Sequence, residues 1–304
     1  MLNNYFVKNI FRALFIAGML FHIGQSQANA QISGMHEHQD MQHMHTMGEE
    51  DISADIKTDP ERIKSGSLTN ILFSIKDHEG KPIQELSVHH DRILHVIIAS
   101  QDFSVFAHIH PEDFCPITPE MKKFARYPVR FTFPKAGRYI IAIDFAVQEQ
   151  LISKHFLIDV AGAPKMGFPT RDLSRDKKFG GLDVTLASIP ERITAGKEVM
   201  LSCFFRKNGK SVTDLEPYLS APMHLAIISN DLTHFIHTHG EVPGMSSMGH
   251  NAHNMQMMNM AVPDKFGPTV EIHVVFPTKG FYQIFGQVGH QGKVIVISFM
   301  VEVE

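Results

Sequence analysis

Three histidines recur at the same spacing in two stretches of the chain. His95–Glu112 reads HVIIASQDFSVFAHIHPE and His224–Glu241 reads HLAIISNDLTHFIHTHGE, with eight of eighteen positions identical. Each stretch is typical of a β-hairpin, because a polar turn separates two extended apolar runs. Pairing around that turn brings His95 to His108 and His110, which share one strand face. Three neutral imidazoles in this arrangement are a common set of metal ligands.

The second copy predicts the same arrangement for His224, His237 and His239. A strand can also carry two such histidines on its solvent face without any metal, and the rings can form a shared hydrogen-bond network. The thirteen-residue spacing from the first to the second histidine is the same in both copies, which favours a ligand role or a shared hydrogen-bond network over solvent-exposed rings.

Two further segments combine methionine with histidine. Thioether sulfur selects Cu(I), whereas imidazole binds zinc and both oxidation states of copper. Ten of the fifteen methionines beyond residue 30 lie in these segments, whereas core methionines would be scattered through strands. We therefore predict copper ligands here; the alternatives are a flexible leader and a surface loop of biased composition. The first segment contributes Met35, His36, His38, Met41, His43, Met44, His45 and Met47, and the second Met245, Met248, His250, His253, Met255, Met257, Met258 and Met260.

The whole unit is duplicated. Pro60–Gly66 matches Pro190–Gly196 at an offset of 130, and the histidine hairpins match at 129. The later match of Phe131–Tyr139 with Val274–Tyr282 has an offset of 143, which locates a fourteen-residue insertion within residues 244–260. Self-similarity along the chain indicates a repeated structural unit.

Each repeat contains six or seven short strands separated by turn signals and lacks a helical period. This pattern predicts an all-β protein with two tandem immunoglobulin-like β-sandwich domains. The predicted organisation is a signal peptide at 1–30, a disordered acidic Met/His-rich tail at 31–59, sandwiches at 60–162 and 183–304, and a linker at 163–182.

The first thirty residues have the features of a secretory signal. Lys8 and Arg12 precede an apolar run at 13–23, and Ala28-Asn29-Ala30 suits cleavage. The apolar run is too short to span a bilayer, so we expect no stable membrane span after cleavage; a retained anchor is the alternative. The mature chain is expected to be periplasmic or secreted.

The net charge disfavours one class of partner, and the two cysteines have different expected surroundings. The net charge of −4 is concentrated in the acidic tail, and no basic patch is present, so nucleic acid is a poor partner. Cys203 is expected in the core, while Cys115 is a free thiol or an extra ligand. Whether the two cysteines pair is open.

Other polar residues near the hairpins receive structural roles. Asp102 and Asp231 are expected to close the hairpin turns through bonds to the backbone. His89, His90 and His234 are predicted to be surface residues, and His290 to be either solvent-exposed or a fourth ligand.

The hairpin pattern HLxxxSxDLxxFxHxHxE followed by FPxxGxYxxxxQ resembles YtkA-like and related heavy-metal-associated exported bacterial domains. It is more loosely similar to CopC-type periplasmic copper carriers. The resemblance covers 60–160 and 190–303 and implies an immunoglobulin-like fold, an exported setting and a ligand role for the two histidine triplets. One departure is Gly240 in place of Pro111, which implies a looser second site.

The favoured hypothesis is a periplasmic copper-binding protein for sequestration, tolerance or delivery, with zinc as a competitor at the histidines. Its expected partners are the metal ion and an envelope metal-transport protein or metalloenzyme. A zinc or copper metalloenzyme is one alternative, although Glu112 and Glu241 are the only candidate bases beside the histidines. An envelope scaffold or interaction protein with structural histidines is another.

Overall fold

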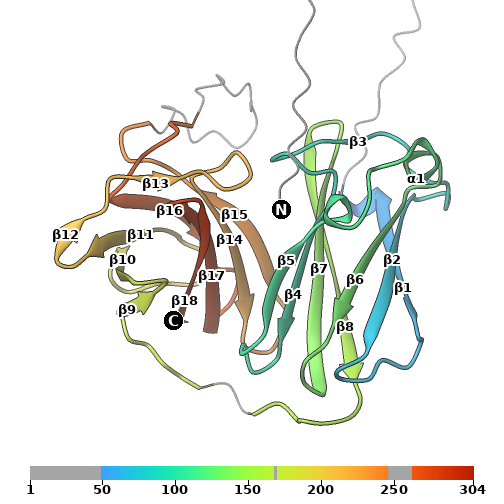
Figure 1. Cartoon of the computed structure of the whole chain (residues 1–304), viewed down its shortest axis with the longest axis horizontal. Coiled ribbons are helices and arrows are strands. Elements are labelled where there is room, and N and C mark those ends of the chain that lie inside the picture. The colour runs from blue at the N-terminus through green and yellow to red at the C-terminus, as the bar shows by residue number, and fades with distance from the viewer. Residues whose placement is uncertain (1–48, 168–169, 246–261) are drawn as a thin grey trace, which may run out of the picture. The chain divides into compact units, whose positions relative to one another are not determined.

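Two β-sandwiches follow one another along the chain in this computed structural model, which describes residues 49–167, 170–245 and 262–304 (Figure 1). The prediction of two tandem immunoglobulin-like sandwiches in an all-β protein is confirmed. The predicted signal peptide, the Met/His-rich tail as far as residue 48 and the insertion from 246 to 260 lie outside the described residues.

The first sandwich has a three-stranded sheet of order β1-β2-β6 and a second sheet of order β3-β7-β4-β5, in which β8 also pairs with β7. All pairings are antiparallel. Its elements are η1 (Glu49–Asp51), β1 (Ile52–Asp59), β2 (Leu68–Asp77), β3 (Leu86–Ser87), β4 (His95–Ser100), β5 (Phe106–Ile109), η2 (Pro111–Asp113), α1 (Pro119–Phe124), β6 (Arg126–Thr132), β7 (Gly137–Val147) and β8 (Gln150–Val160).

The second sandwich repeats this plan. One sheet has the order β12-β11-β10-β9 with β16 also on β11, and the other has the order β13-β17-β14-β15 with β18 also on β17. Its strands are β9 (Asp176–Phe179), β10 (Leu182–Ile189), β11 (Glu198–Lys207), β12 (Lys210–Ser211), β13 (Leu215–Glu216), β14 (Met223–Ser229), β15 (Phe235–Gly240), β16 (Thr269–Val275), β17 (Gly280–His290) and β18 (Lys293–Val303).

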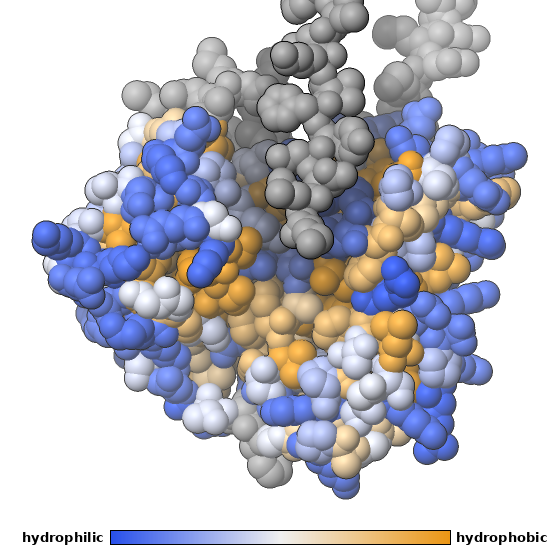
Figure 2. Space-filling view, viewed as in Figure 1, coloured by the Kyte–Doolittle hydropathy of each residue, from blue (hydrophilic) through white to orange (hydrophobic). Residues whose placement is uncertain are grey.

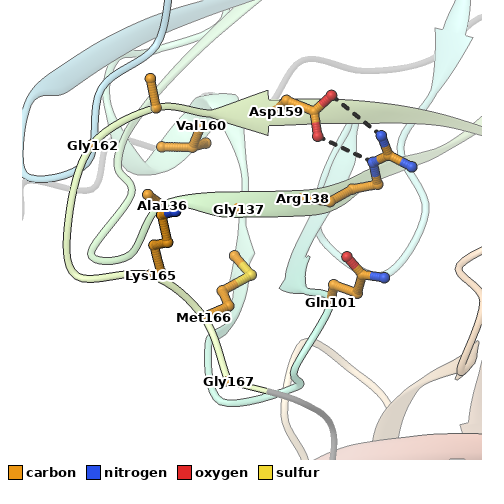
Figure 3. Close-up of a pocket in the computed structure, with 11 residues that line it drawn as sticks. Gln101, Ala136, Gly137, Arg138, Asp159, Val160, Gly162, Lys165, Met166 and Gly167 are labelled. Carbon is orange, nitrogen blue, oxygen red and sulfur yellow. Dashed lines mark hydrogen bonds and ion pairs between the residues drawn. The ribbon is translucent and has the colours of Figure 1, made fainter.

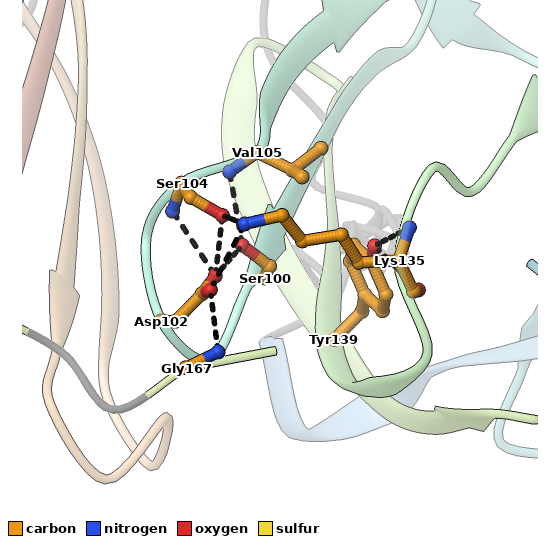
Figure 4. Close-up of polar contacts among 7 residues, drawn as sticks. All are labelled: Ser100, Asp102, Ser104, Val105, Lys135, Tyr139 and Gly167. Carbon is orange, nitrogen blue, oxygen red and sulfur yellow. Dashed lines mark hydrogen bonds and ion pairs between the residues drawn. The ribbon is translucent and has the colours of Figure 1, made fainter. Parts of the chain in front are cut away.

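The two histidine hairpins are β4-β5 and β14-β15, and their turns are closed by aspartates as predicted. Ser100 Oγ and Ser104 Oγ each donate to Asp102 Oδ1 at 2.7 Å (Figure 4). The backbone N–H of Gly167 donates to Asp102 Oδ2 at 3.2 Å, which ties the chain beyond β8 to this turn. Asp231 accepts equivalent bonds from Ser229 Oγ and from the backbone N–H of Thr233.

Strands β4 and β7 are buried on both faces, as continuous apolar runs require. One face packs into the core of its own sandwich through residues such as Val96 and Ile141. The other face, with Ile97 and Ala142, joins a separate apolar cluster to which the second sandwich contributes Ala226, Ile228, Leu232 and Phe285. The rings of Phe106 and Phe285 stack there at 4.2 Å between centroids.

The two sandwiches therefore share a buried apolar contact. The described residues between 49 and 304 belong to one compact unit. Figure 2 shows hydrophobic side chains gathered toward the middle of the face that it displays, with hydrophilic side chains along its outer edges.

Two boundary predictions are corrected by the structure, which also contains one helix that was not predicted. The predicted disordered tail extended to Asp59, but Ile52–Asp59 form β1, because Ile52, Ala54 and Ile56 alternate with polar residues and face the core. The predicted linker at 163–182 contains β9, which pairs with β10. The short helix α1 was not predicted; Thr118 caps it by accepting a bond from the backbone N–H of Met121 at 3.1 Å.

The assignment of β1 to the first sandwich predicts a stability difference between two substitutions in that strand. Ile52→Ala should lower the free energy of unfolding by about 2–5 kcal/mol, because it removes a buried side chain from the core. Lys57→Ala, in the same strand but exposed, is the control and should change it by less than about 0.5 kcal/mol. Chemical denaturation would measure both, and equal stabilities would contradict the assignment.

A candidate metal centre between the two sandwiches

Seven histidines from the two repeats meet where the sandwiches pack together. They form three overlapping sets in which one ring nitrogen from each member lies within 4.8 Å of the others. We call these the first set (His95, His108, His110), the central set (His95, His224, His237) and the second set (His90, His224, His239). His95 and His224 each belong to two sets, so the cluster is continuous.

Equivalent residues of the two repeats meet each other in this region. The rings of His95 and His224 stack at 5.7 Å between centroids, and those of His108 and His237 lie 5.9 Å apart. Such contacts between equivalent positions are expected when the same face of each repeat packs against its counterpart about a pseudo-twofold axis. The histidines are buried here because they share strand faces with the apolar residues of that contact, such as Ile97 and Ala226.

The first set is formed by the β4-β5 hairpin as the sequence predicts. The strand pairing places His108 of β5 opposite Ile97 of β4. His95 lies two residues before Ile97, and His110 lies two residues after His108, so all three histidines share one face of the hairpin. His95 Nδ1 lies 3.0 Å from His108 Nε2, and His110 Nε2 lies 3.1 Å from the same atom. His95 and His110 are each 1% exposed and His108 is 8% exposed.

In each of these three rings, the nitrogen that faces away from the other two rings (the outer nitrogen) has a hydrogen-bond partner that determines where the ring proton lies. His95 Nε2 is 3.0 Å from the carbonyl oxygen of His89, and His108 Nδ1 is 2.7 Å from Gln287 Oε1. His110 Nδ1 is 3.0 Å from Asp113 Oδ2. Each of these partners is an acceptor, so each outer nitrogen must donate the single proton of a neutral ring.

The three inner nitrogens therefore carry lone pairs that point at one another. Two lone pairs cannot form a hydrogen bond, so the 3.0 and 3.1 Å separations lack a proton to bridge them. Nitrogens bound at about 2.0–2.1 Å to one tetrahedral ion stand about 3.3 Å apart. Hydrogen bonding of the outer nitrogen to a carbonyl or carboxylate is also how metal-bound histidines are held. The first set thus fits a bound cation.

Burial keeps the rings of His95, His110 and His224 uncharged at neutral pH. Burial is the largest cause of a lowered pKa throughout, and it brings the pKa of His95 to about 2, that of His224 to about 3 and that of His110 to about 4. Repulsion by His237 lowers the pKa of His95 further. At neutral pH these rings therefore present lone pairs, which is the form that binds metal.

The rings of His224, His237 and His239 meet as predicted, with centroids 4.6–5.7 Å apart, but their nitrogens do not form a set of their own as those of the first repeat do. His224 Nε2 is 3.1 Å from the carbonyl oxygen of Leu219, which leaves Nδ1 for the cluster. His237 is drawn toward Asp144 of the first repeat, with Nδ1 and Oδ2 2.9 Å apart. His239 instead approaches His90, with ring centroids 3.9 Å apart. Asp144 and His90 both belong to the first repeat, and the second repeat has a different residue at each equivalent position.

His89 and His90 were predicted to lie at the surface, and this prediction is wrong. They precede β4 in a tight turn in which His90 and Asp91 have φ values of 46° and 63°. Ser220 Oγ of the other repeat donates to Asp91 Oδ2 at 2.6 Å, which holds the turn against the cluster. Nothing in the periodicity of this loop signals that contact, since it depends on how the repeats dock.

Asp144 and Gln287 are functional candidates that sequence analysis did not identify. They occupy equivalent positions in β7 and β17, at the offset of 143, and each contacts the middle histidine of the other repeat's hairpin. The available signal was a polar residue inside each buried apolar strand, IIAIDFAV and IFGQVGH. Buried polar groups require partners, so such residues point to a polar site.

The remaining predicted residues have other surroundings. His290 is buried, but it lies near Asp214, with Nε2 and Oδ1 3.5 Å apart, and belongs to none of the three sets. Glu112 Oε1 accepts the backbone N–H of Ile93 at 2.8 Å and so supports the turn before β4. Met245 is the one described member of the Met/His insertion.

The cysteines and Gly240 have structural surroundings. Both cysteines are free, and Cys203 is a core residue as predicted, whose thiol pKa burial raises to about 12. Gly240 was expected to loosen the second site. It is buried instead, and an added Cβ would clash with Val270 Cγ1, so the position is closely packed.

A surface pocket at the turn end of the first hairpin lacks the chemistry of the histidine cluster. Its polar side chains include Gln101 and the ion pair of Arg138 with Asp159, whose Nε and Oδ1 lie 3.1 Å apart (Figure 3). Because this ion pair is exposed, it contributes little stability. None of the three histidine sets reaches this pocket.

Fold and site together define a two-domain β-sandwich protein with a buried histidine cluster at the contact between its domains. The chain belongs to the family described as Domain of unknown function (DUF8832), whose model matches twice, at residues 45–162 and 177–304. No curated protein matches the chain.

Among solved structures, the chain is similar to the Escherichia coli adhesin FdeC (10% identity, TM-score 0.25) and the Yersinia pseudotuberculosis adhesin InvE (10% identity, TM-score 0.24). Each match covers 83% of this chain, but the chain spans only 65% of the FdeC structure and 60% of the InvE structure. Neither likeness bears on the function proposed below. In the part of the chain that the structure describes, no helix is both long and apolar enough to cross a membrane.

The outer hydrogen bonds predict the tautomer of each histidine in the metal-free protein. His95 should carry its proton on Nε2, whereas His108 and His110 should carry theirs on Nδ1. Long-range ¹H–¹⁵N correlation spectra distinguish these forms directly. A proton on His108 Nε2 would mean that the Gln287 amide has the opposite orientation, and it would replace the converging lone pairs with an ordinary hydrogen bond.

Proposed function

We propose that this chain is an exported metal-binding protein, which holds a copper or zinc ion in the histidine cluster for sequestration, tolerance or delivery. The observation that carries the proposal is the convergence of three unprotonated nitrogens: His95 Nδ1 and His110 Nε2 lie 3.0 and 3.1 Å from His108 Nε2. Without a cation, the folded protein would hold these lone pairs together in a buried place at a cost.

The donor set limits the choice of metal. Imidazole nitrogen suits zinc and both oxidation states of copper, while calcium and magnesium require oxygen ligands. Methionines in 31–48 and 245–260 would add soft sulfur ligands that capture Cu(I). The resemblance of the hairpin pattern to exported heavy-metal-associated domains supports the same class of metal and an envelope setting.

Burial favours holding an ion over catalysis. Catalytic zinc sites keep one position open for water or substrate. The three residues of the first set are at most 8% exposed, and the apolar cluster shared by both sandwiches includes neighbours of these residues on the same strand faces. An ion held there would exchange through a partner protein, such as an envelope metal transporter or a metalloenzyme.

The second candidate is an envelope scaffold in which the histidines only join the two sandwiches. The observation that favours it is the set of bonds across the contact, His108 to Gln287 and Ser220 to Asp91, beside a shared apolar cluster. These interactions could fix the relative positions of the sandwiches without a metal. The two candidates differ in what happens when metal is added or removed.

Replacing His95 and His224 together with alanine should abolish tight metal binding, because every one of the three sets contains at least one of them. The mature wild-type protein, titrated with Zn(II) and Cu(II), should retain metal after dialysis and gain about 2.7 kcal/mol of stability at a free metal concentration of 100 times Kd. Elemental analysis and thermal denaturation measure the two effects. His78→Ala, in an exposed turn, is the control and should behave as wild type.

The scaffold candidate predicts a different pattern. If the wild-type protein retains neither Zn(II) nor Cu(II), binds no Cu(I), and has the same stability with and without these ions, then the metal proposal is refuted. A circular dichroism spectrum of the double variant tests folding. His95→Gln with His224→Gln keeps polar side chains of similar size and serves where the alanine variant does not fold.

Deleting residues 244–260 should lower the number of Cu(I) ions bound while leaving Zn(II) binding to the histidine cluster unchanged. Six methionines lie in this segment, and thioether ligands bind Cu(I) in preference to Zn(II). Replacing the same segment with a Gly/Ser sequence of equal length is the matched control for chain connectivity and should give the same loss. An unchanged Cu(I) stoichiometry would count against a metal role for the insertion.

A further inference from the structure

Asp144 gives the histidine cluster a negative charge on one side only. We infer that Asp144 directs a divalent ion to the central set of His95, His224 and His237, whereas a monovalent ion occupies the first set beside neutral Gln287. This inference rests on the proposed metal-binding function and adds to it the position and charge class of the ion.

The surroundings of Asp144 require a positively charged partner. Its side chain is fully buried, and Ser153 Oγ donates to Oδ1. Oδ2 finds no hydrogen-bond donor of acceptable geometry among the described residues, although His237 Nδ1 lies 2.9 Å away. A buried carboxylate is stable only when it is paired with a positive group. A cation bound to the other nitrogen of His237 would supply that charge through the ring.

His237 belongs to the central set and lies beside Asp144. Its side chain is 1% exposed, and its Nε2 also has no hydrogen-bond partner in the described part of the chain. A carboxylate at Nδ1 that leaves Nε2 for an ion is a recurring arrangement around metal-bound histidines, and it makes the ring a stronger ligand. The central set is the only one of the three that contains His237.

The sets compete because two histidines are shared. His95 and His224 each donate from Nε2 to a backbone carbonyl, so each has a single nitrogen, Nδ1, available to an ion. An ion in the central set uses both and excludes ions from the first and second sets. The cluster therefore holds either one central ion or as many as two ions in the outer sets.

Charge decides between these arrangements. The attraction between a carboxylate and an ion doubles when the ionic charge rises from one to two, so Asp144 favours a divalent ion in the central set. Gln287, the equivalent residue, contacts His108 of the first set at 2.7 Å and contributes no charge. A monovalent ion gains less from Asp144 and can use the first set, whose nitrogens already converge.

The test compares His237→Ala, His110→Ala and Asp144→Asn in the full mature chain, titrated separately with Zn(II) and with Cu(I). His237→Ala and Asp144→Asn should each weaken Zn(II) binding 10–100-fold, whereas His110→Ala should change it less than threefold. Cu(I) binding should show the opposite order, with the loss confined to His110→Ala. Wild-type protein should bind one Zn(II) per chain.

Equal Zn(II) affinity in Asp144→Asn and wild type, or a larger Zn(II) loss in His110→Ala than in His237→Ala, would overturn this inference while leaving the metal-binding function intact. Absence of Zn(II) and Cu(I) binding by the wild type would instead refute the proposed function itself. Asn has nearly the size of Asp, so Asp144→Asn should fold. Gln287→Glu in the Asp144→Asn background gives a second measurement, because it should make Zn(II) binding depend on His110.

Discussion

The burial of uncharged histidine rings between two apolar sheet faces is the constraint on which the rest of this structure depends. A ring that loses water on both nitrogens must find protein partners for them. In the first repeat the outer nitrogens find the carbonyl of His89, the amide of Gln287 and the carboxylate of Asp113. Once those partners have fixed the protons, the inner nitrogens have no donor left among themselves, and a cation is the simplest group that satisfies them.

Duplication supplies both the rigidity and the asymmetry of the cluster. The apolar residues of β4, β7, β14 and β17 pack face to face, and this contact brings equivalent histidines together. Where the repeats still match, as at His95 and His224, the ring environments are alike. The symmetry is broken where equivalent positions have diverged: Gln287 replaces Asp144, and Leu219 replaces His90, in the second repeat. Three dissimilar sets then arise from two hairpins of similar sequence.

Much of the fold and half of the cluster could be predicted from the sequence, because they depend on local pattern. Alternation and turn residues identified the hairpins, and strand pairing placed His95 beside His108 and His110. The strand at Ile52–Asp59 was missed because its acidic residues, on the exposed face, resembled the tail before it. Its alternating Ile52, Ala54 and Ile56 were nevertheless a readable signal.

The other half of the cluster depends on docking between the repeats, which no local pattern encodes. His90, Asp144 and the division of His224 between two sets become functional candidates only after the two sheet faces are in contact. The buried polar positions in β7 and β17 were the closest available sign, since a polar residue in a strand buried on both faces must have a polar partner, and Asp144 and Gln287 each contact a histidine of the other sandwich.

Whether a set takes its ligands from one repeat or from both has a thermodynamic consequence for the proposed function. The central and second sets take ligands from both repeats, so an ion bound there also stabilises the contact between the sandwiches, by linkage. The first set takes its ligands from one repeat and only an orienting bond from the other. Binding of an ion in the first set is therefore coupled to docking only through His108 and Gln287. Under the proposed function, a divalent ion would hold the two sandwiches together more strongly than a monovalent one.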